Sequence, residues 1–335
     1  MTVETGGITA ESVNRIWPVA PSRSLRRMKL GTNNRSFVVE GNDGTYFLKI
    51  YHNAPDPSRC LFEHRITAAI AARNPPFAVP EIILSRSGET HIHVGGLFHA
   101  LTTFIPGSVV SDGDPDETAA CGRALADLHV TLAKAELGVP EAGPRTFGDL
   151  KKAHPLVQDP ERAIRDATGD DDLSKAAVAI VSLVQSQWLA LTTGWPLTWI
   201  HGDFYPSNVL RQGHRVTGIV DFEFAGAGFR AMDVAIGLSA FAFDGSGWGI
   251  LADRFATGYL SRLDLTSEEI EAIPTLILMR EATSLVHWTG RHRQGMRDWP
   301  GVGDRARKLV RLAEFLDRNG AGLVERLHAA GTRAI

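Results

Sequence analysis

Three polar side chains in the middle of the chain have the types and the spacing that metal-assisted chemistry needs. The segment HGDFYPSNVL (201–210) contains Asp203 and, five residues later, Asn208, and the segment IVDFEF (219–224) contains Asp221. Carboxylate and amide oxygens are the hard ligands that Mg²⁺ prefers. Asn208 and Asp221 can therefore hold a magnesium ion, which leaves Asp203 to orient a hydroxyl group and to accept its proton.

The spacing of these residues is also that of a protein-kinase catalytic loop, in which an Asp and an Asn precede a metal-binding Asp. Such a set suits phosphoryl transfer, because the phosphoryl group must be held in line with its acceptor. Taken singly, each residue is equally typical of a turn in a Pro-containing loop. A zinc site or a metal-dependent hydrolase built on His201, Asp203 and Asp221 is a weaker alternative, since no further His or Cys follows at metal-ligand spacing.

The two segments together resemble a known family. HGDFYPSNVL with IVDFEFAGAGFRAMDVAIGL (219–238) is similar to the core of the aminoglycoside phosphotransferase and choline kinase superfamily, whose members have a protein-kinase-like fold and phosphorylate small alcohols or sugars. GIVDFEFA (218–225) and the helical C-terminal part are most similar to the type II homoserine kinase branch. The resemblance covers roughly residues 25–290 and implies an ATP- and Mg²⁺-dependent kinase.

The resemblance implies a role for each residue of this core. Asp203 corresponds to the catalytic base, and Asn208 and Asp221 correspond to the magnesium ligands. His201 corresponds to a loop histidine that packs and forms hydrogen bonds. Asp233 corresponds to an aspartate that braces the catalytic loop from the next helix, although its position also suits a helix N-cap.

In the family, a lysine on an N-terminal strand holds the ATP α- and β-phosphates and pairs with a glutamate on the following helix. Lys49 in YFLKIY (46–51) fits the lysine, and Glu63 fits the glutamate. The alternative interpretations are that Lys49 is a solvated strand residue and that Glu63 is an ordinary surface glutamate.

The loop expected to cover the phosphates departs from the glycine-rich pattern of protein kinases, since only Gly31 precedes Thr32 and the following polar residues. Backbone N–H groups of such a loop can still face phosphate oxygens, and we expect contacts from Asn33 and Ser36. By analogy with the fold, the adenine is expected beside the backbone from Thr103 to Ile105.

Hydrophobic patterns predict an α+β fold with two lobes, and the resemblance implies that this fold is protein-kinase-like. Residues 30–41 and 45–51 alternate as strands around the turn sequence GNDG, and residues 55–73 repeat apolar positions at helical spacing. Later segments are mostly helical. We therefore expect a small β-rich nucleotide-binding lobe (1–105) and a larger helical lobe for catalysis and acceptor binding (106–335).

Composition narrows the choice of partners and compartment. The chain has 335 residues, a net charge of −3 and two cysteines, and no apolar run is long enough to span a bilayer. A nucleic-acid or membrane partner is not expected. The cysteine content and the absence of a signal peptide favour the cytoplasm, and the protein is expected to be a monomer or homodimer.

A basic stretch near the C-terminus bears on the acceptor. Residues 291–311 contain seven Lys or Arg and two Asp. Charge complementarity favours an acceptor with a carboxylate or a phosphate, such as homoserine or a similar hydroxy-amino acid. The same residues could instead only solvate the last helix. An aminoglycoside or other antibiotic phosphotransferase, and a nucleotide-binding scaffold without catalysis, are the alternative functions.

Overall fold

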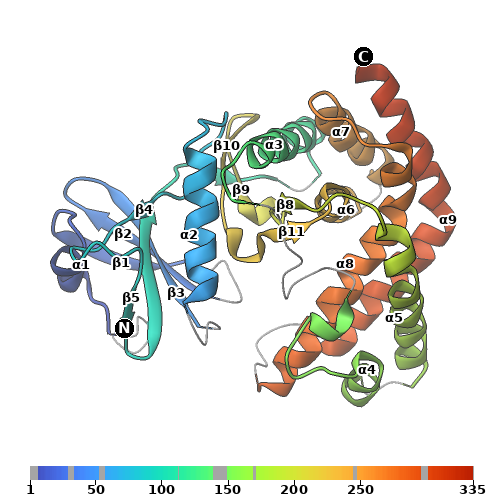
Figure 1. Cartoon of the computed structure of the whole chain (residues 1–335), viewed down its shortest axis with the longest axis horizontal. Coiled ribbons are helices and arrows are strands. Elements are labelled where there is room, and N and C mark those ends of the chain that lie inside the picture. Colours follow the sequence, from blue (N-terminus) through green and yellow to red (C-terminus); the bar gives the residue numbers. More distant parts are fainter. Residues whose placement is uncertain are drawn as a thin grey trace. The chain divides into compact units, whose positions relative to one another are not determined.

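The computed structural model describes residues 7–28, 34–52, 57–111, 113–138, 149–168, 171–243, 247–295 and 301–334. The chain forms two compact units (Figure 1). Unit 1 comprises the residues up to Val110, Lys134–Leu137 and Ser207–Glu223, and unit 2 comprises Ser111–Ala133, Gly138–Pro206 and the chain from Phe224 onward. A β-rich unit and a mostly helical unit agree with the predicted two-lobed α+β fold. The functions assigned to residues 1–105 and 106–335 stay predictions.

Unit 1 is built on an antiparallel sheet with the strand order β1-β2-β3-β6-β4, in which β5 also pairs with β6. Its elements are α1 (Ala10–Ile16), β1 (Ser22–Arg27), β2 (Arg35–Gly41), β3 (Thr45–Tyr51), α2 (Ser58–Ala71), β4 (Ile82–Ile83), β5 (Ile92–Val94), β6 (Leu97–Thr103), β7 (Ser108–Val109), β9 (Val209–Gln212) and β10 (Arg215–Ile219). The predicted hairpin is β2–β3 and the predicted helix is α2, so both are confirmed; β3 has the predicted bounds, and β2 and α2 are shorter than predicted.

Side chains of β3 alternate between the two faces of the sheet, because successive strand residues point to opposite faces. Leu48 and Ile50 join a core with Trp17, which follows α1. Lys49 and Tyr51 therefore point to the other face, and there Tyr51 packs with Cys60 of α2. This register places the side chain of Lys49 beside α2.

The β9–β10 hairpin, although distant in sequence, belongs to unit 1. It forms a three-stranded sheet with β7. It also meets the segment before β4, where the Ala78 backbone N–H donates to Thr217 and the Ile219 N–H donates to Ala78. These bonds bring the end of β10, and with it Asp221, into the unit that carries Lys49.

Unit 2 is mostly helical. It contains α3 (Pro115–Ala133), the short 3₁₀ helix η1 (Leu150–Lys152), α4 (Pro160–Thr168), α5 (Asp171–Thr192), β8 (Thr198–Ile200), β11 (Gly226–Gly228), α6 (Arg230–Phe241), α7 (Trp248–Leu260), α8 (Ser267–Arg293) and α9 (Val302–Ala334). Two further 3₁₀ turns, η2 (Pro206–Asn208) and η3 (Phe222–Phe224), lie where the chain passes between the units. The long helices α8 and α9 pack side by side, orange and red in Figure 1.

Within the described ranges, every helix is too short or too polar to cross a membrane.

Candidate active site

Lys49 is the centre of an ion cluster in unit 1. Its Nζ lies 2.8 Å from Oε1 and 3.0 Å from Oε2 of Glu63 on α2. The same nitrogen lies 2.8 Å from Oδ1 of Asp221 and 3.9 Å from Oε2 of Glu223. The expected ion pair between Lys49 and Glu63 is thus present, and Asp221 adds a second one.

The cluster keeps its lysine charged although the side chain is buried. Burial alone lowers the pKa of Lys49, but the carboxylates of Asp221 and Glu63 outweigh burial and raise this pKa well above its ordinary value. Tyr51 Oη completes the arrangement by donating to Glu63 Oε2 at 3.0 Å. One cation then faces three carboxylates, which leaves a formal charge of −2 around Lys49.

Asp221 itself is held in an unusual backbone conformation. Its φ is +64°, in the left-handed region that non-glycine residues adopt only when the surroundings impose it. Such conformations concentrate at functional sites. Here the preceding strand β10 fixes the approach, and Asp221 leaves it with its side chain directed to Lys49.

Asn208 is brought to the same end of the β9–β10 hairpin. Val209 pairs with Ile219 in the strand register, and the N–H of Val220 donates to the backbone oxygen of Asn208 at 2.9 Å. Asn208 is buried. The structure therefore places Asn208 and Asp221 at the two adjoining ends of one hairpin.

The loop that carries Asp203 is fixed within unit 2 by a buried carboxylate. Asp233 of α6 accepts hydrogen bonds from the N–H groups of His201 at 2.7 Å and Gly202 at 2.8 Å. It also contacts Nε2 of His129 at 3.1 Å. The N-cap residue of α6 is Phe229, so Asp233 does not occupy the N-cap position.

Gly202 is required at its place in this loop. Its φ is +76°, and a Cβ atom there would lie 2.4 Å from the backbone oxygen of Phe224. Next to it, the N–H of Asp203 donates to Nδ1 of His201 at 3.2 Å. Both residues before Asp203 thus restrict where the Asp203 carboxylate can point.

Arg280 of α8 holds that carboxylate directly. Its Nη2 lies 3.0 Å from Oδ1 of Asp203, and its guanidinium lies over the ring of Tyr205. Burial lowers the pKa of Arg280, but Tyr205 and Asp203 outweigh burial and raise it above its ordinary value. Arg280 is therefore a permanent positive charge beside Asp203.

Of the remaining predicted residues, Ser36, Thr103 and Ile105 lie in or next to the sheet of unit 1. Ser36 pairs with Lys49 across β2 and β3. Thr103 ends β6 and exchanges hydrogen bonds with Glu81, and Ile105 follows as a buried residue. Asn33 lies outside the described residues. The phosphate and adenine contacts predicted for this group stay predictions.

Sequence reasoning missed several residues of these clusters. Glu223 lies two residues after Asp221 in the same motif and could have been suspected, as could Asn34, which donates a hydrogen bond to Glu223. Arg280 had only a weak signal, a charged residue inside the apolar run ILMREA (277–282).

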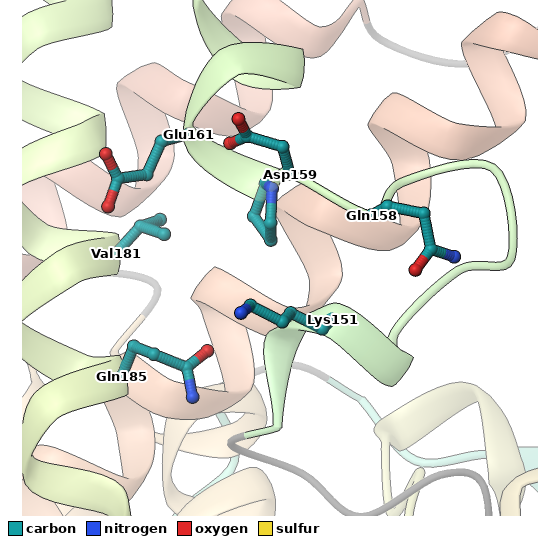
Figure 2. A pocket seen from close by; sticks show the side chains of 7 residues that line it. Lys151, Gln158, Asp159, Glu161, Val181 and Gln185 are labelled. Atoms are coloured by element: carbon teal, nitrogen blue, oxygen red, sulfur yellow. The ribbon is translucent and has the colours of Figure 1, made fainter.

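A separate cavity of about 430 Å³ in unit 2 lies among η1, α4 and α5 (Figure 2). Lys151, Asp159, Glu161 and Gln185 are among its lining residues. None of the residues predicted for catalysis lines it, and its polar groups are mostly solvated or already bonded, as Glu161 is to Ser182.

Comparison with known proteins connects these clusters to a family. The model of the phosphotransferase enzyme family matches residues 24–270, which is well over half of the chain. The chain belongs to the phosphotransferase enzyme family. The predicted superfamily and enzyme class, a kinase that acts on hydroxyl groups of small molecules, are thereby confirmed.

Relatives of this phosphotransferase include the homoserine kinase of Xanthobacter autotrophicus, 29% identical over 77% of this chain and 78% of the relative. The homoserine kinase of Beijerinckia indica is 28% identical over 79% of this chain and 80% of the relative. Similarity to the homoserine kinase branch, expected from the GIVDFEFA segment, is confirmed.

Solved structures with the same fold include a microcompartment-associated aminopropanol kinase, with a TM-score of 0.70, 20% identity and coverage of 97% of this chain and 99% of that one. An amicoumacin kinase in complex with AMP-PNP and Ca²⁺ has a TM-score of 0.64 and 13% identity over 88% of each chain. These similarities confirm the protein-kinase-like fold of the phosphotransferase.

Proposed function

We propose that this phosphotransferase transfers the γ-phosphoryl group of ATP to the side-chain hydroxyl of homoserine or a similar hydroxy-amino acid, with Mg²⁺. The observation that carries the proposal is the pair of short contacts from Lys49, one to Glu63 and one to Asp221. A buried lysine bound to two carboxylates is costly as a structural device. It is useful where the lysine must be presented to phosphate oxygens in a fixed position.

In this proposal, Glu63 and Tyr51 orient Lys49, and Lys49 binds the α- and β-phosphates of ATP. The backbone near Ser36 and Asn33 covers the phosphates, and the segment from Thr103 to Ile105 lies against the adenine. Each of these groups acts by positioning, which together with charge neutralisation is the main part of catalysis in phosphoryl transfer.

The residues present fit a magnesium ion. The hairpin end offers an amide oxygen from Asn208 and a carboxylate from Asp221, both hard ligands. The formal charge of −2 around Lys49, Glu63, Asp221 and Glu223 also favours a divalent cation. When bound, Mg²⁺ would neutralise charge on the phosphate oxygens.

Asp203 is proposed as the base. Its carboxylate accepts a hydrogen bond from the acceptor hydroxyl and takes the proton as the hydroxyl oxygen bonds to the γ-phosphorus and the bond to the β–γ bridging oxygen breaks. Arg280 fixes the orientation of the Asp203 carboxylate, and Asp233 with His201 fixes its loop. Product release then yields ADP and the phosphorylated alcohol.

Homoserine is proposed as the acceptor because two relatives that this chain matches over most of their length are homoserine kinases. The basic side chains near Asp203, among them Arg280 and Arg305, disfavour a polycationic aminoglycoside by charge repulsion. We place the enzyme in the cytoplasm, since Cys60 and Cys121 are both free and buried.

The proposal is tested by measuring ADP release with homoserine, and with an aminoglycoside as the comparison acceptor, in the presence and absence of Mg²⁺. The Asp203→Asn variant keeps a partner for Arg280 and should lose about 10²- to 10⁴-fold in kcat. Undiminished turnover in this variant would rule out Asp203 as the base. Turnover of the aminoglycoside without turnover of homoserine would refute the proposed acceptor.

A further inference from the structure

The ion pair of Lys49 and Glu63 continues into a chain of hydrogen bonds inside unit 1. Oη of Tyr51 lies 3.0 Å from Oε2 of Glu63. The same oxygen lies 3.3 Å from Nε2 of His64, the residue that follows Glu63 in α2. All four residues are buried, and His64 is only 5% exposed. The chain of bonds from His64 to Lys49 is therefore largely shielded from water.

The local structures of β3 and α2 bring these side chains together. Lys49 and Tyr51 are two residues apart in a strand, so they point to the same face of the sheet. Glu63 and His64 are consecutive buried residues of α2. The rings of Tyr51 and His64 meet edge to face, with centroids 6.2 Å apart and planes at 67°. The Tyr51 hydroxyl thus meets both residues of α2.

The direction of each hydrogen bond follows from the charge on Glu63. An ionised carboxylate only accepts, so the Tyr51 hydroxyl donates its single proton to Glu63. Burial and the nearby Glu63 carboxylate raise the pKa of Tyr51 well above its ordinary value, which keeps this proton on the hydroxyl. The bond between Tyr51 and Nε2 must then be donated by His64.

His64 is suited to this donation because its ring is neutral. Burial lowers the pKa of His64 from 6.5 to about 3. A neutral imidazole carries one N–H group, and the contact with Tyr51 assigns it to Nε2. Nδ1 of His64 is buried and has no hydrogen-bond partner among the described residues. The opposite tautomer would leave a buried N–H group on Nδ1 without a partner and would also lose the bond to Tyr51.

The orientation of Glu63 matters because Lys49 is bound from two sides. Nζ of Lys49 lies 2.8 Å from Glu63 and 2.8 Å from Asp221. The terminal torsion of a glutamate side chain has a broad minimum, and a rotated Glu63 would leave Nζ to Asp221 alone. The Tyr51 hydroxyl holds Oε2 of Glu63 and so opposes this rotation.

We propose that His64 is a positioning residue for nucleotide binding: its Nε2–H group holds the Tyr51 hydroxyl on Glu63, and Glu63 then presents Lys49 to the phosphates of the nucleotide. The inference rests on the proposed function, in which Lys49 binds these phosphates. It predicts that the affinity for a nucleotide depends on His64, and that the affinity for adenosine, which has no phosphate group, does not.

The test is titration calorimetry of the full chain with AMP-PNP and Mg²⁺, and with adenosine as the phosphate-free probe. His64→Phe keeps a flat ring but removes the donor. Its Kd for AMP-PNP should rise about 3- to 10-fold, as expected for one hydrogen bond, while its Kd for adenosine should change by less than about twofold. His64→Gln retains an N–H donor and should keep the Kd for AMP-PNP within about twofold of wild type.

A double-mutant cycle separates positioning from simple packing. Tyr51→Phe removes the hydroxyl and should raise the Kd for AMP-PNP about 10- to 100-fold, because Glu63 loses a charge-assisted hydrogen bond. Since His64 acts through that hydroxyl, adding His64→Phe to Tyr51→Phe should raise the Kd by less than about twofold further. His93→Phe is the control, because it replaces an exposed histidine of the same unit and should leave both affinities unchanged.

Three results would overturn the inference: an unchanged Kd for AMP-PNP in folded His64→Phe, an equal loss of affinity for adenosine, or full additivity of the two substitutions. Should His64→Phe not fold, His64→Leu removes the same donor and is judged by the same results. Tight binding of AMP-PNP by wild type and His64→Phe alike would refute the role of His64 and leave the proposed function intact. A wild-type enzyme that binds AMP-PNP but does not phosphorylate homoserine would instead refute the proposed acceptor, and the calorimetry, which needs no acceptor, would still decide the role of His64.

Discussion

Lys49 is a single cation among Glu63, Asp221 and Glu223, and its burial makes the balance of these charges important for stability as well as for the proposed chemistry. Lys49 and Glu63 each expose only 10% of their side chains. Removing one partner of a buried ion pair leaves an uncompensated charge, which costs more than the pair itself contributes.

Lys49→Met should therefore destabilise the protein and abolish turnover together. The carboxylates of Glu63, Asp221 and Glu223 would remain close to one another without their cation, and we expect a loss of about 3 kcal/mol in the free energy of unfolding. Urea unfolding measures this loss. Arg73→Gln, which removes an exposed ion pair with Glu136, is the control and should change stability by less than about 0.5 kcal/mol. An unchanged unfolding midpoint for Lys49→Met would show that the cluster contributes no stability.

His64 should make the stability depend on pH. Burial lowers the pKa of His64 in the folded protein from 6.5 to about 3. Between these values the unfolded chain binds a proton that the folded chain does not, so protons favour unfolding. Stability is greatest above pH 6.5 and falls toward pH 3, by about 1.4 kcal/mol per pH unit for this group.

His64→Phe removes the titrating ring and should reduce that slope by about the same amount. Urea unfolding of both proteins at a series of pH values measures the difference. Because the ring also meets Tyr51 Oη at 3.3 Å, the variant is compared with wild type through the slope rather than through the absolute stability. Parallel pH profiles would contradict the lowered pKa of His64.

At the scale of elements, the sequence predicted what depends on local periodicity. The alternation in Thr45–Tyr51 and the helical repeat in Ser58–Ala71 are visible in neighbouring residues, and so is the five-residue spacing of Asp203 and Asn208. The contact of Arg280 with Asp203 joins residues 77 positions apart. Such a contact depends on how α8 packs, and the hydrophobic pattern does not encode it. For the same reason, the sequence does not show that Arg305 lies against the ring of Trp288 whereas Arg307 pairs with Asp304.

Helices α3 and α7 approach so closely that two glycines are needed where they cross. A Cβ atom on Gly122 would lie 2.1 Å from the backbone oxygen of Phe255, and one on Gly258 would lie 2.0 Å from that of Ala119. These neighbours are backbone atoms and cannot rotate away. The close approach also positions Tyr259 of α7 to bond His129 of α3 at 2.8 Å.

Gly122→Ala should therefore lower the free energy of unfolding by about 1–3 kcal/mol, as overpacking does. Gly322→Ala in α9 is the matched control, because nothing lies within 4 Å of its added Cβ, and it should stabilise the helix by up to about 1 kcal/mol. Thermal unfolding followed by circular dichroism compares the two. Equal melting temperatures for Gly122→Ala and wild type would mean that the helices can separate at no cost.

At the scale of the whole molecule, each unit is assembled from three stretches of chain. Unit 1 needs Ser207–Glu223 to obtain the β9–β10 hairpin. Asn208 and Asp221, the proposed magnesium ligands, therefore belong to the same compact unit as Lys49, although 172 positions separate Lys49 from Asp221. The oligomeric state stays a prediction.

A fragment ending at Val110 should consequently fail both as a folding unit and as a nucleotide binder. It keeps Lys49 and Glu63 but loses Asp221, Asn208 and the β9–β10 hairpin, whose strand β9 pairs with β7. We expect no cooperative melting transition for the fragment and no shift with ADP and Mg²⁺, whereas the full chain should show both. A sharp, nucleotide-sensitive transition in the fragment would refute this dependence.

Asp233 accepts hydrogen bonds from the backbone N–H groups of His201 and Gly202, and its carboxylate also contacts residues outside this loop. Through His129, the same carboxylate is connected to α3 and, through Tyr259, to α7. Side chains of α3, α6 and α7 therefore hold the backbone of the loop before Asp203 in place. Preorganisation of this kind lowers the activation barrier, because no groups need to be rearranged when the new bond forms. In the proposed mechanism, part of the catalytic rate is thus prepared by the packing of α3, α6 and α7.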